Sequence, residues 1–312
     1  MPKQVALILL NWNTPRHTID CILSIQQYCD AQLFDIIVVD NGSTDNSLTL
    51  LQNQFPGLIY IDNKENLGFA EGNNKGLAYS IDKGYTYSLV MNTDTLVDED
   101  IVTKLSQHLN TYSQAAAVQP AIYWLHDKTK IWNGEGTFNA FLGKTLSSTT
   151  LPDQSDINNH KTVEWVTGCC MMIRNAALVT NGGFNKRFFL YYEDVELSFR
   201  LRGSGYELHY LPSSKMCHEA GVSAKVEKKE GFLSPVIHYY ISRNHIWFLR
   251  RYGKPLCYPV NIVYNGAYYL SLLAYFTLRG RFNKANYLLK GLTEGLFTSK
   301  NLIWDPNNSN IR

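Results

Sequence analysis

The first 115 residues alternate between short apolar runs and longer segments in which apolar residues recur at helical spacing. The apolar runs have the length of β-strands and occupy residues 5–10, 34–39, 58–61 and 87–91. The segments between them predict helices that begin near Pro15 and that cover residues 71–80 and 98–112. Strands that are apolar on both faces and alternate with helices are typical of a mostly parallel sheet covered on both sides. The sequence therefore predicts an α/β fold.

Each of these predicted strands is followed by a polar cluster. The clusters occupy residues 11–14, 40–45, 63–68 and 92–95. In open parallel sheets, ligands bind outside the carboxyl ends of the strands. We therefore expect the four clusters to converge on one edge of the sheet and to form a binding site there.

Charge and cysteine usage exclude several classes of protein. The chain has 29 Lys plus Arg and 27 Asp plus Glu, a formal net charge of +2, which does not suggest a partner nucleic acid. Its six cysteines form no CxxC pair, so we expect buried thiols in a reducing compartment. The N-terminal apolar run is too short for a signal peptide and lacks a cleavage site. We therefore expect a cytoplasmic protein.

The C-terminal region has a different composition from the rest of the chain. Residues 255–278 carry no charged side chain, are rich in Tyr and are flanked by Arg and Lys. The stretch is long enough to span a bilayer, but it contains Pro259, Asn261 and Gly266. Three interpretations remain: a helix pair in the membrane plane, a helix of a soluble core or dimer interface, and a span. The Tyr and Arg content favours a position at a membrane–water interface over a position inside the lipid core.

The usual nucleotide-binding loops are absent from the sequence. The first predicted strand is followed by Asn11-Trp12-Asn13-Thr14, where a dinucleotide fingerprint would carry GxGxxG. Neither GxxxxGK[ST] nor GxSxG occurs. A Rossmann dehydrogenase, a P-loop NTPase and an α/β-hydrolase are therefore not expected.

Two of the polar clusters suit a nucleotide. Asp40 ends a strand, where its carboxylate can accept a hydrogen bond from a base N–H, or can cap the following turn instead. In the segment that contains Asn66, Gly68 and Asn73, the glycine allows close approach of the backbone, and the next helix offers free N–H groups to an anion.

The cluster Asn92-Thr93-Asp94 suits a divalent metal. An acidic tip after a buried strand can hold Mg²⁺ or Mn²⁺, although a turn with a helix-capping Asp has the same composition. His218 follows a predicted strand and can complete a metal site or contact phosphate. The other histidines show no metal-ligand spacing, so we interpret them as structural or solvated; they are His17, His108, His126, His160, His209, His238 and His245.

Glu193 and Asp194 open a predicted helix after a run of aromatic residues. Adjacent helical side chains point about 100° apart, so the two cannot serve one substrate as an acid–base pair. One of them can act as a single general base. Alternatively, both only complement the helix dipole.

Eight segments together resemble a known family. They are LILLNWN (7–13), IIVVDNGSTDNS (36–47), NKENLGFAEGNNKGL (63–77), LVMNTDT (89–95), WVTGCCMMIRNAAL (165–178), GGFNKRFFLYYEDVELSFRLRGSGYE (182–207), HEAGVSA (218–224) and RNHIWFLRRYG (243–253). In this order the chain resembles family 2 glycosyltransferases of the GT-A fold, in particular bacterial rhamnosyltransferase-like enzymes. The resemblance implies a Rossmann-like, mostly parallel sheet with a C-terminal helical, membrane-associated extension.

The resemblance also implies roles for single residues. Those beside the nucleoside, sugar or diphosphate are Asn11, Asn13, Asp40, Asn66, Gly68, Asn73, Asn92 and Thr93. Among these, Asp40 matches the position that reads the base. Asp94 matches the last acid of a DxD-like metal motif, and His218 matches a histidine that helps to hold metal or diphosphate. Asp194 matches the catalytic base. Asn92 stands where many members carry Asp, which predicts weaker binding of Mg²⁺ or Mn²⁺.

The expected reaction follows from the resemblance. It is inverting transfer of a sugar from dTDP-rhamnose or a UDP-sugar to a hydroxyl of a glycan or lipid-linked acceptor, in bacterial surface polysaccharide synthesis. Residues 1–115 would form the nucleotide-binding half and residues 116–234 the acceptor-binding half of one catalytic domain. Residues 235–312 would form helices that contact the inner face of the membrane or a second copy in a homodimer. The alternatives are a degenerate GT-A scaffold subunit and a sugar-phosphate nucleotidyltransferase.

Overall fold

The computed structural model describes residues 3–153, 156–220 and 233–311. Its strands are β1 (Val5–Asn11), β2 (Phe34–Asp40), β3 (Ile59–Asp62), β4 (Tyr87–Met91), β5 (Thr95–Leu96), β6 (Ala115–Trp124), β7 (Ile131–Asn133), β8 (Gly136–Asn139), β9 (Lys144–Ser147), β10 (Lys161–Thr162), β11 (Cys170–Arg174) and β12 (Glu207–His218). Its α-helices are α1 (Pro15–Tyr28), α2 (Ser47–Gln54), α3 (Gly68–Asp82), α4 (Ile101–Thr111), α5 (Asn175–Asn181), α6 (Glu193–Gly203), α7 (Pro235–Tyr252), α8 (Tyr258–Leu278), α9 (Phe282–Phe297) and α10 (Lys300–Ile303). Short 3₁₀ helices are η1 (Lys186–Phe188), η2 (Pro255–Cys257) and η3 (Pro306–Asn308).

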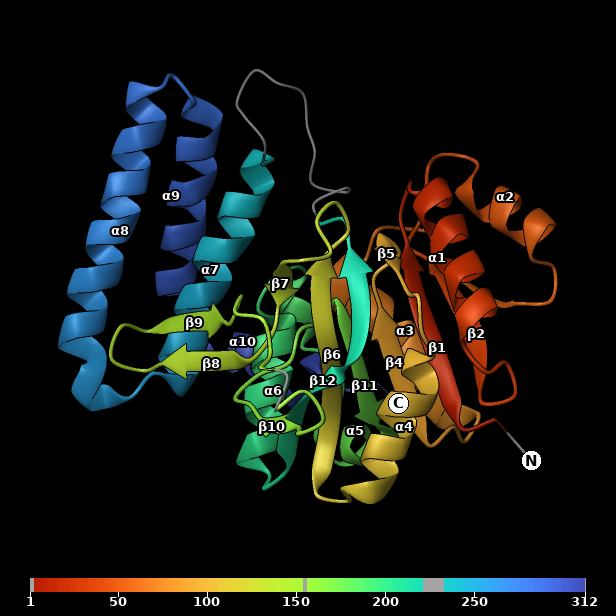
Figure 1. The fold of residues 1–312 in the computed structure, drawn as a ribbon. Coiled ribbons are helices and arrows are strands. Elements are labelled where there is room, and N and C mark those ends of the chain that lie inside the picture. The colour runs from red at the N-terminus through yellow and green to blue at the C-terminus, as the bar shows by residue number, and fades with distance from the viewer. Residues whose placement is uncertain (1–2, 154–155, 221–232, 312) are drawn as a thin grey trace.

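One large mixed sheet forms the centre of the molecule (Figure 1). Its strand order is β10-β12-β6-β11-β4-β1-β2-β3, with β5 paired to β12 and β7 paired to β6. The four strands of the first half run parallel, and β6 and β12 are also parallel to each other. By contrast, β11 is antiparallel to both of its neighbours, and β10 is antiparallel to β12. The predicted α/β class and mostly parallel sheet are therefore confirmed, and the second half makes the sheet mixed.

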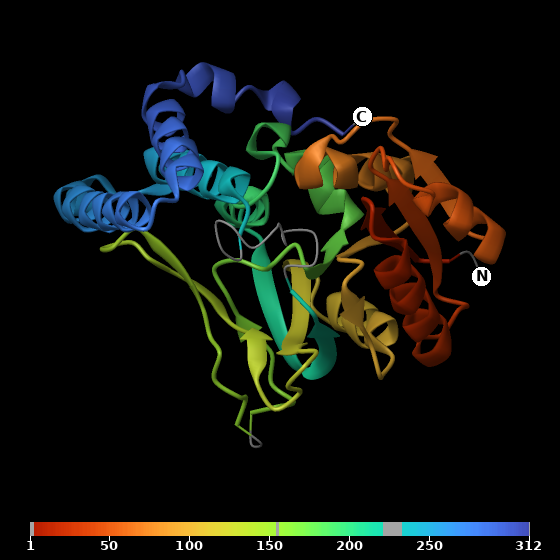
Figure 2. The ribbon, with the colours of Figure 1, turned by 90° about the horizontal axis from the view of Figure 1, so that it is seen from above.

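Both faces of the sheet are buried, as the unbroken apolar runs predict. Along β1, the side chains of Val5, Leu7 and Leu9 join one apolar cluster with α1 and α4. Those of Ala6 and Ile8 join a second cluster with α3, α5 and α6. Viewed from above, helices lie on both sides of the first-half strands (Figure 2). Because all four parallel strands end at the same edge, the loops that follow them are brought together.

The C-terminal helices α7, α8 and α9 stand side by side beside the sheet (Figures 1 and 2). The β8–β9 hairpin reaches across to them, and its tip is bound by side chains of α7 and α8. The amide of Asn261 donates to the carbonyls of residues 140 and 141 (3.1 and 2.6 Å), and Asn265 donates to that of residue 142 (2.9 Å). The ring of His245 contacts the carbonyl of Gly143 (2.7 Å). This hairpin therefore links the second half of the sheet to the C-terminal helices.

In α8, the uncharged stretch forms a helix of 21 residues. Of the helices in residues 3–153, 156–220 and 233–311, none combines the length and the apolar character needed to cross a membrane.

The end of the chain returns to the sheet after α9. The amide of Asn185 donates to the carbonyl of Ile303 (3.0 Å), and the backbone N–H of Gly183 donates to that of Ser309 (2.8 Å). Ile311 is buried in the second apolar cluster. The C-terminal region is thus joined to the sheet both through the hairpin and through its own last residues.

Element ends differ from the sequence prediction where a side chain caps the backbone or a strand continues. Helix α4 starts at Ile101 rather than at residue 98, because Asp100 is its N-cap and accepts from the N–H of Thr103 (2.9 Å). His218, expected to follow a strand, is instead the last residue of β12, which continues to it through a break in register. That continuation brings His218 to the edge where the first-half strands end.

The buried face of α1 offers a matched test of the fold. Ile22 is fully buried in the first cluster, whereas its neighbour Leu23 is 46% exposed on the same helix. We expect Ile22→Ala to lower the free energy of unfolding in urea by about 2–5 kcal/mol, because it removes buried methyl groups and leaves a cavity. Leu23→Ala should change it by about 0.5 kcal/mol or less. Equal losses for the two variants would contradict this packing.

Candidate active site

Asn11 and Asp40 lie side by side at the ends of β1 and β2. The amide of Asn11 donates to Asp40 Oδ1 (2.8 Å), and its carbonyl accepts from the hydroxyl of Thr18 (2.8 Å). The hydroxyl of Ser43 donates to Asp40 Oδ1 (2.7 Å) and its N–H donates to Oδ2 (2.9 Å). A carboxylate has about four acceptor positions, so Asp40 retains one, on Oδ2, although only 2% of the residue is exposed.

Side-chain amides hold the loops after β2 and β3 together. Asn13, which has a positive φ of 54°, accepts from the N–H of Thr44 (2.8 Å). The amide of Asn41 donates to Asn66 Oδ1 (3.1 Å) and to the carbonyl of Gly68 (3.1 Å). The predicted convergence of the polar clusters is thus visible as direct hydrogen bonds between three of them. The sequence analysis missed Asn41 and Ser43, and their signal was the turn composition directly after Asp40.

The backbone at Gly68 packs closely against Phe189. Its φ is +77°, and a Cβ there would lie 2.5 Å from the Phe189 ring and 2.6 Å from the Phe189 carbonyl oxygen. The N–H of Ala70 donates to that same carbonyl (3.1 Å). Asn73, on the next turn of α3, donates to the carbonyl of Phe69 (2.9 Å), while its buried Oδ1 has no partner within the described residues. Gly68 therefore joins the loop after β3 to the segment before α6.

Asp94 and His218 form a pair, although they lie far apart in the sequence. Strand β5 pairs with the end of β12, which places His218 Nε2 3.0 Å from Asp94 Oδ1. Burial alone would raise the pKa of Asp94, but the hydrogen bond and charge of His218 outweigh it and hold that pKa below its ordinary value. The ring of Trp132 packs edge-on against His218, with centroids 4.3 Å apart. The buried Nδ1 of His218 has no hydrogen-bond partner in the part of the chain that is described.

Asp194 lies in the first turn of α6 with both carboxylate oxygens bound by backbone. Oδ2 accepts from the N–H of Gly168 (2.8 Å) and Oδ1 accepts from the N–H of Val195 (2.8 Å). Burial raises the pKa of Asp194 above its ordinary value, although these N–H groups oppose the shift. Burial and the nearby Asp194 charge raise the pKa of Glu193 well above its ordinary value. Asp194 is therefore held in a fixed orientation by backbone N–H groups, while burial disfavours the charged form of Glu193.

Residues 168 and 169, directly before β11, connect the two acidic sites. The N–H of Gly168 binds Asp194, and the carbonyl of Cys169 accepts from the N–H of Asn92 (2.8 Å). A Cβ at Gly168 would lie 2.9 Å from the Phe69 ring and 3.5 Å from the Asp194 Cβ. Burial, followed by the charges of Asp94 and Asp194, raises the pKa of the Cys169 thiol. Asp94 and Asp194 thus flank the same short segment.

The turn that precedes Asp194 has an unusual backbone conformation. Phe189, Tyr191 and Tyr192 all have positive φ, between 61° and 69°, which is unfavourable for residues with a Cβ. Helix α7 holds this turn: Asn244 donates to the carbonyls of residues 188, 190 and 191 (2.8, 2.9 and 2.7 Å). Arg243 donates to the carbonyls of residues 187 and 188 (2.8 and 3.1 Å). The sequence analysis included residues 243–253 in the resemblance but did not anticipate that Arg243 and Asn244 hold this turn.

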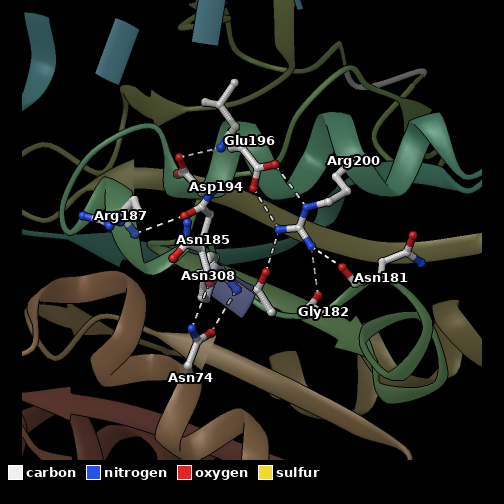
Figure 3. A network of polar contacts seen from close by, with 12 residues as sticks. Asn74, Asn181, Gly182, Asn185, Arg187, Asp194, Glu196, Arg200 and Asn308 are labelled. Carbon is white, nitrogen blue, oxygen red and sulfur yellow. Dashed lines mark hydrogen bonds and ion pairs between the residues drawn. The ribbon is translucent and has the colours of Figure 1, made fainter. Parts of the chain in front are cut away.

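A second polar network fixes α6 from its other side (Figure 3). Arg200 forms an ion pair with Glu196 (2.8 Å) and donates to the carbonyls of Asn181, Gly182 and Gly183. Asn74 of α3 donates to the carbonyl of residue 184 (2.8 Å) and accepts from its N–H (2.9 Å). The helix that carries Asp194 is therefore tied to the segment before it and to α3.

Comparison with known proteins defines the family. The family model "Glycosyl transferase family 2" matches residues 8–179, more than half of the chain. The chain belongs to glycosyl transferase family 2. The match includes the ends of β1, β2 and β4, where Asn11, Asp40 and Asp94 lie, and ends before α6.

Three curated relatives, each less than 30% identical to this chain, are named as rhamnosyltransferases. The chain is 28% identical over 202 residues to Rhamnosyltransferase WbbL of Escherichia coli, covering 61% of this chain and 75% of that one. It is 26% identical over 201 residues to N-acetylglucosaminyl-diphospho-decaprenol L-rhamnosyltransferase of Mycobacterium tuberculosis, covering 59% of this chain and 66% of that one. It is 22% identical over 287 residues to dTDP-rhamnosyl transferase RfbF of Shigella flexneri, covering 84% and 93%. The predicted rhamnosyltransferase-like character of this family 2 member is thereby confirmed.

A solved structure confirms the GT-A-like fold. The mannosyltransferase PcManGT from Pyrobaculum calidifontis, solved with GDP-Man and Mn²⁺, superposes with a TM-score of 0.57 at 14% identity. The alignment covers 94% of this chain and 87% of that one. At this identity the likeness concerns the fold, including the C-terminal helical extension.

Two glycines with positive φ allow a matched test of the contact between Gly68 and Phe189. Gly84 has nearly the same φ as Gly68, +75° against +77°, but has open space around it. We expect Gly84→Ala to cost about 1–2 kcal/mol of unfolding free energy, from the backbone alone. Gly68→Ala should cost a further 1–3 kcal/mol or so, because its methyl group collides with Phe189. Urea denaturation measures both, and a Gly68→Ala loss no larger than that of Gly84→Ala would contradict the close contact.

Proposed function

We propose that this protein is an inverting glycosyltransferase that moves a sugar from a nucleoside-diphosphate donor to an acceptor hydroxyl, with Asp194 as the general base. The observation that carries the proposal is the position of Asp94 and Asp194 on either side of residues 168 and 169, at the edge where β1, β2 and β4 end. A diphosphate at one carboxylate and an acceptor hydroxyl at the other would meet at this segment. Family membership supports the reaction class.

Asp94 and His218 fit a divalent cation such as Mg²⁺ or Mn²⁺. The lowered pKa of Asp94 keeps its carboxylate ionised at neutral pH, and carboxylate oxygens suit both ions. His218 Nε2, which lies 3.0 Å from Asp94 Oδ1, is the ring nitrogen that faces the same place and would be a second donor atom. Asn92 and Thr93 precede Asp94 in the same loop and would contact the diphosphate. A cation held there would stabilise negative charge on the departing nucleoside diphosphate.

Asp194 would take the proton from the acceptor hydroxyl as its oxygen bonds to the anomeric carbon and the bond to the diphosphate breaks. Its raised pKa makes it a stronger base than an ordinary Asp, and its two backbone hydrogen bonds fix its orientation. No covalent sugar intermediate is needed, since one displacement inverts the anomeric carbon.

The donor nucleotide would lie over the loops after β1, β2 and β3. The remaining acceptor position on Asp40 Oδ2 suits the N3–H of thymine or uracil. Asn11 and Asn13 would shape the pocket by holding residues 40–44, and Asn66, Gly68 and Asn73 would form its other wall. The names of the three relatives favour a rhamnosyl donor such as dTDP-rhamnose over a UDP-sugar. Residues 1–115 would then bind the donor and residues 116–234 the acceptor.

We further propose a lipid-linked or glycan acceptor at the inner face of the membrane. One relative's name includes a diphospho-decaprenol acceptor. Helix α8 exposes large apolar side chains, among them Ile262 (71%), Val263 (73%) and Leu270 (68%), and basic residues flank the helix. Peripheral contact of this surface with a membrane, or with a second copy of the chain, would bring such an acceptor close to α7 and Asp194.

Asp194→Asn tests the general base. We expect kcat to fall by about 10²–10⁴-fold, because the amide cannot accept the proton, while the affinity for the donor nucleotide stays unchanged. Glu193→Gln is the matched control: it makes the same acid-to-amide change at the neighbouring position and should retain most of the activity. Steady-state kinetics and calorimetric titration of the nucleotide measure the two effects. Full activity of Asp194→Asn would defeat the assignment.

Thermal unfolding with nucleotides tests the donor site. We expect UDP or dTDP to raise the Tm in the presence of Mn²⁺, because ligands that bind the native state stabilise it by mass action, whereas GDP and CDP should not. Asp94→Asn should remove the part of the shift that depends on Mn²⁺. If no nucleotide shifts the Tm of the folded wild type, the degenerate scaffold becomes the better explanation. A shift with nucleoside triphosphates instead would favour the nucleotidyltransferase.

A further inference from the structure

Three histidines that are far apart in the sequence meet at the outer edge of the sheet. His108 lies near the end of α4, His160 lies directly before β10, and His209 lies on β12. One nitrogen from each ring lies within 4.8 Å of the others. His108 Nε2 and His209 Nδ1 are 2.8 Å apart, and the rings of His160 and His209 have centroids 4.2 Å apart. Such a convergence of imidazoles is the donor set that Zn²⁺ and related ions take in proteins.

Burial disfavours the charged form of two of these imidazoles, His108 and His160. Burial, together with the two neighbouring rings, lowers the pKa of His108 to about 4. Burial also lowers the pKa of His160, followed by the effect of His209. The side chain of His209 is fully buried between them. The cluster thus consists of two buried histidines and one half-buried histidine.

Metal-binding histidines usually donate their other ring N–H to a carboxylate or carbonyl, and Glu207 is placed to accept from His209 in this way. Its Oε2 lies 2.9 Å from His209 Nε2, so the proton of that ring is held on Nε2 and the lone pair of Nδ1 faces His108 and His160. In the metal-free arrangement, His108 Nε2–H then donates to His209 Nδ1. When a metal binds, His108 carries its proton on Nδ1 instead, and both facing nitrogens become ligands without net proton release.

We propose that His108, His160 and His209 form a binding site for a borderline divalent transition metal, with Zn²⁺ as the natural occupant. Tetrahedral ligands about 2.0–2.1 Å from Zn²⁺ lie about 3.3 Å from each other. The close pair would open by roughly 0.5 Å and His160 would move inward to complete the set, leaving the fourth position to water. The ion would clamp the segment before β10 to α4 and β12.

This site is separate from the pair Asp94 and His218. His209 lies near the start of β12 and His218 ends it, and the strand has 12 residues. At about 3.3 Å per residue, the two histidines are more than roughly 20 Å apart. Nitrogen donors also favour Zn²⁺, Co²⁺ or Ni²⁺ over Mg²⁺ and Mn²⁺, which prefer oxygen. A metal ion here would therefore hold the segment before β10 in place, and it would not contact the diphosphate.

Cobalt titration of the untagged, full-length chain tests the proposal. We expect one Co²⁺ per chain with the visible bands of a tetrahedral site, and displacement by Zn²⁺. His160→Ala should abolish the bands, and Glu207→Gln, at a half-exposed position that should not affect folding, should weaken binding by about 10–100-fold. His126→Ala, which removes an exposed histidine outside the cluster, and Asp94→Asn should leave both bands and stoichiometry unchanged.

Thermal unfolding gives an independent measurement. Zn²⁺ should raise the Tm of the wild type, of His126→Ala and of Asp94→Asn, but not that of His160→Ala. The proposal is overturned if wild-type protein shows no tetrahedral Co²⁺ bands, if His160→Ala binds as well as His126→Ala does, or if Asp94→Asn removes the signal. The last result would assign the ion to the diphosphate site.

Discussion

The geometry of this protein depends on how α7 holds the turn before α6. Three non-glycine residues in that turn have left-handed backbone, each at a cost of roughly 1–3 kcal/mol. Five hydrogen bonds from Arg243 and Asn244 to its carbonyls offset that cost. Without them the turn would relax, and Asp194 would lose its alignment with Gly168. The C-terminal helices are therefore part of the machinery that positions the proposed base, whatever else their exposed apolar surface contacts.

The loops after β1, β2 and β3 are held together in a different way. There, short amide and hydroxyl side chains replace regular backbone pairing. Asn11, Asp40 and Ser43 form one hydrogen-bonded group, and Asn41 joins the loops after β2 and β3. Every one of these bonds is buried or half-buried, so the loops are fixed before any ligand arrives. Such preorganisation lowers the entropy that ligand binding would otherwise lose. The price is that most polar groups there are already engaged, which leaves Asp40 a single free acceptor position.

The sequence correctly predicted those elements that depend only on residues close together in the chain. The apolar runs of β1, β2 and β4 are buried on both faces, and the polar clusters after them meet at one edge, as their periodicity predicts. The start of α4 was misplaced because Asp100 caps the helix instead of entering it. Gly68 was expected to allow close approach of the backbone, and in the structure the group it approaches is Phe189. A glycine signals close approach, but the sequence does not say of what.

By itself, the sequence determined the α/β class, the edge where the polar clusters meet and the family, because strand hydrophobicity and short motifs are properties of neighbouring residues. Only the tertiary structure decided which distant residues meet. Asp94 reaches His218 because β5 pairs with the end of β12, and Asn244 reaches the turn before Asp194 because α7 packs across it. His108, His160 and His209 show no ligand spacing along the chain, yet the pairing of β10 with β12 beside α4 brings them together. Contacts of this kind depend on the register and packing of whole elements, which no local pattern encodes.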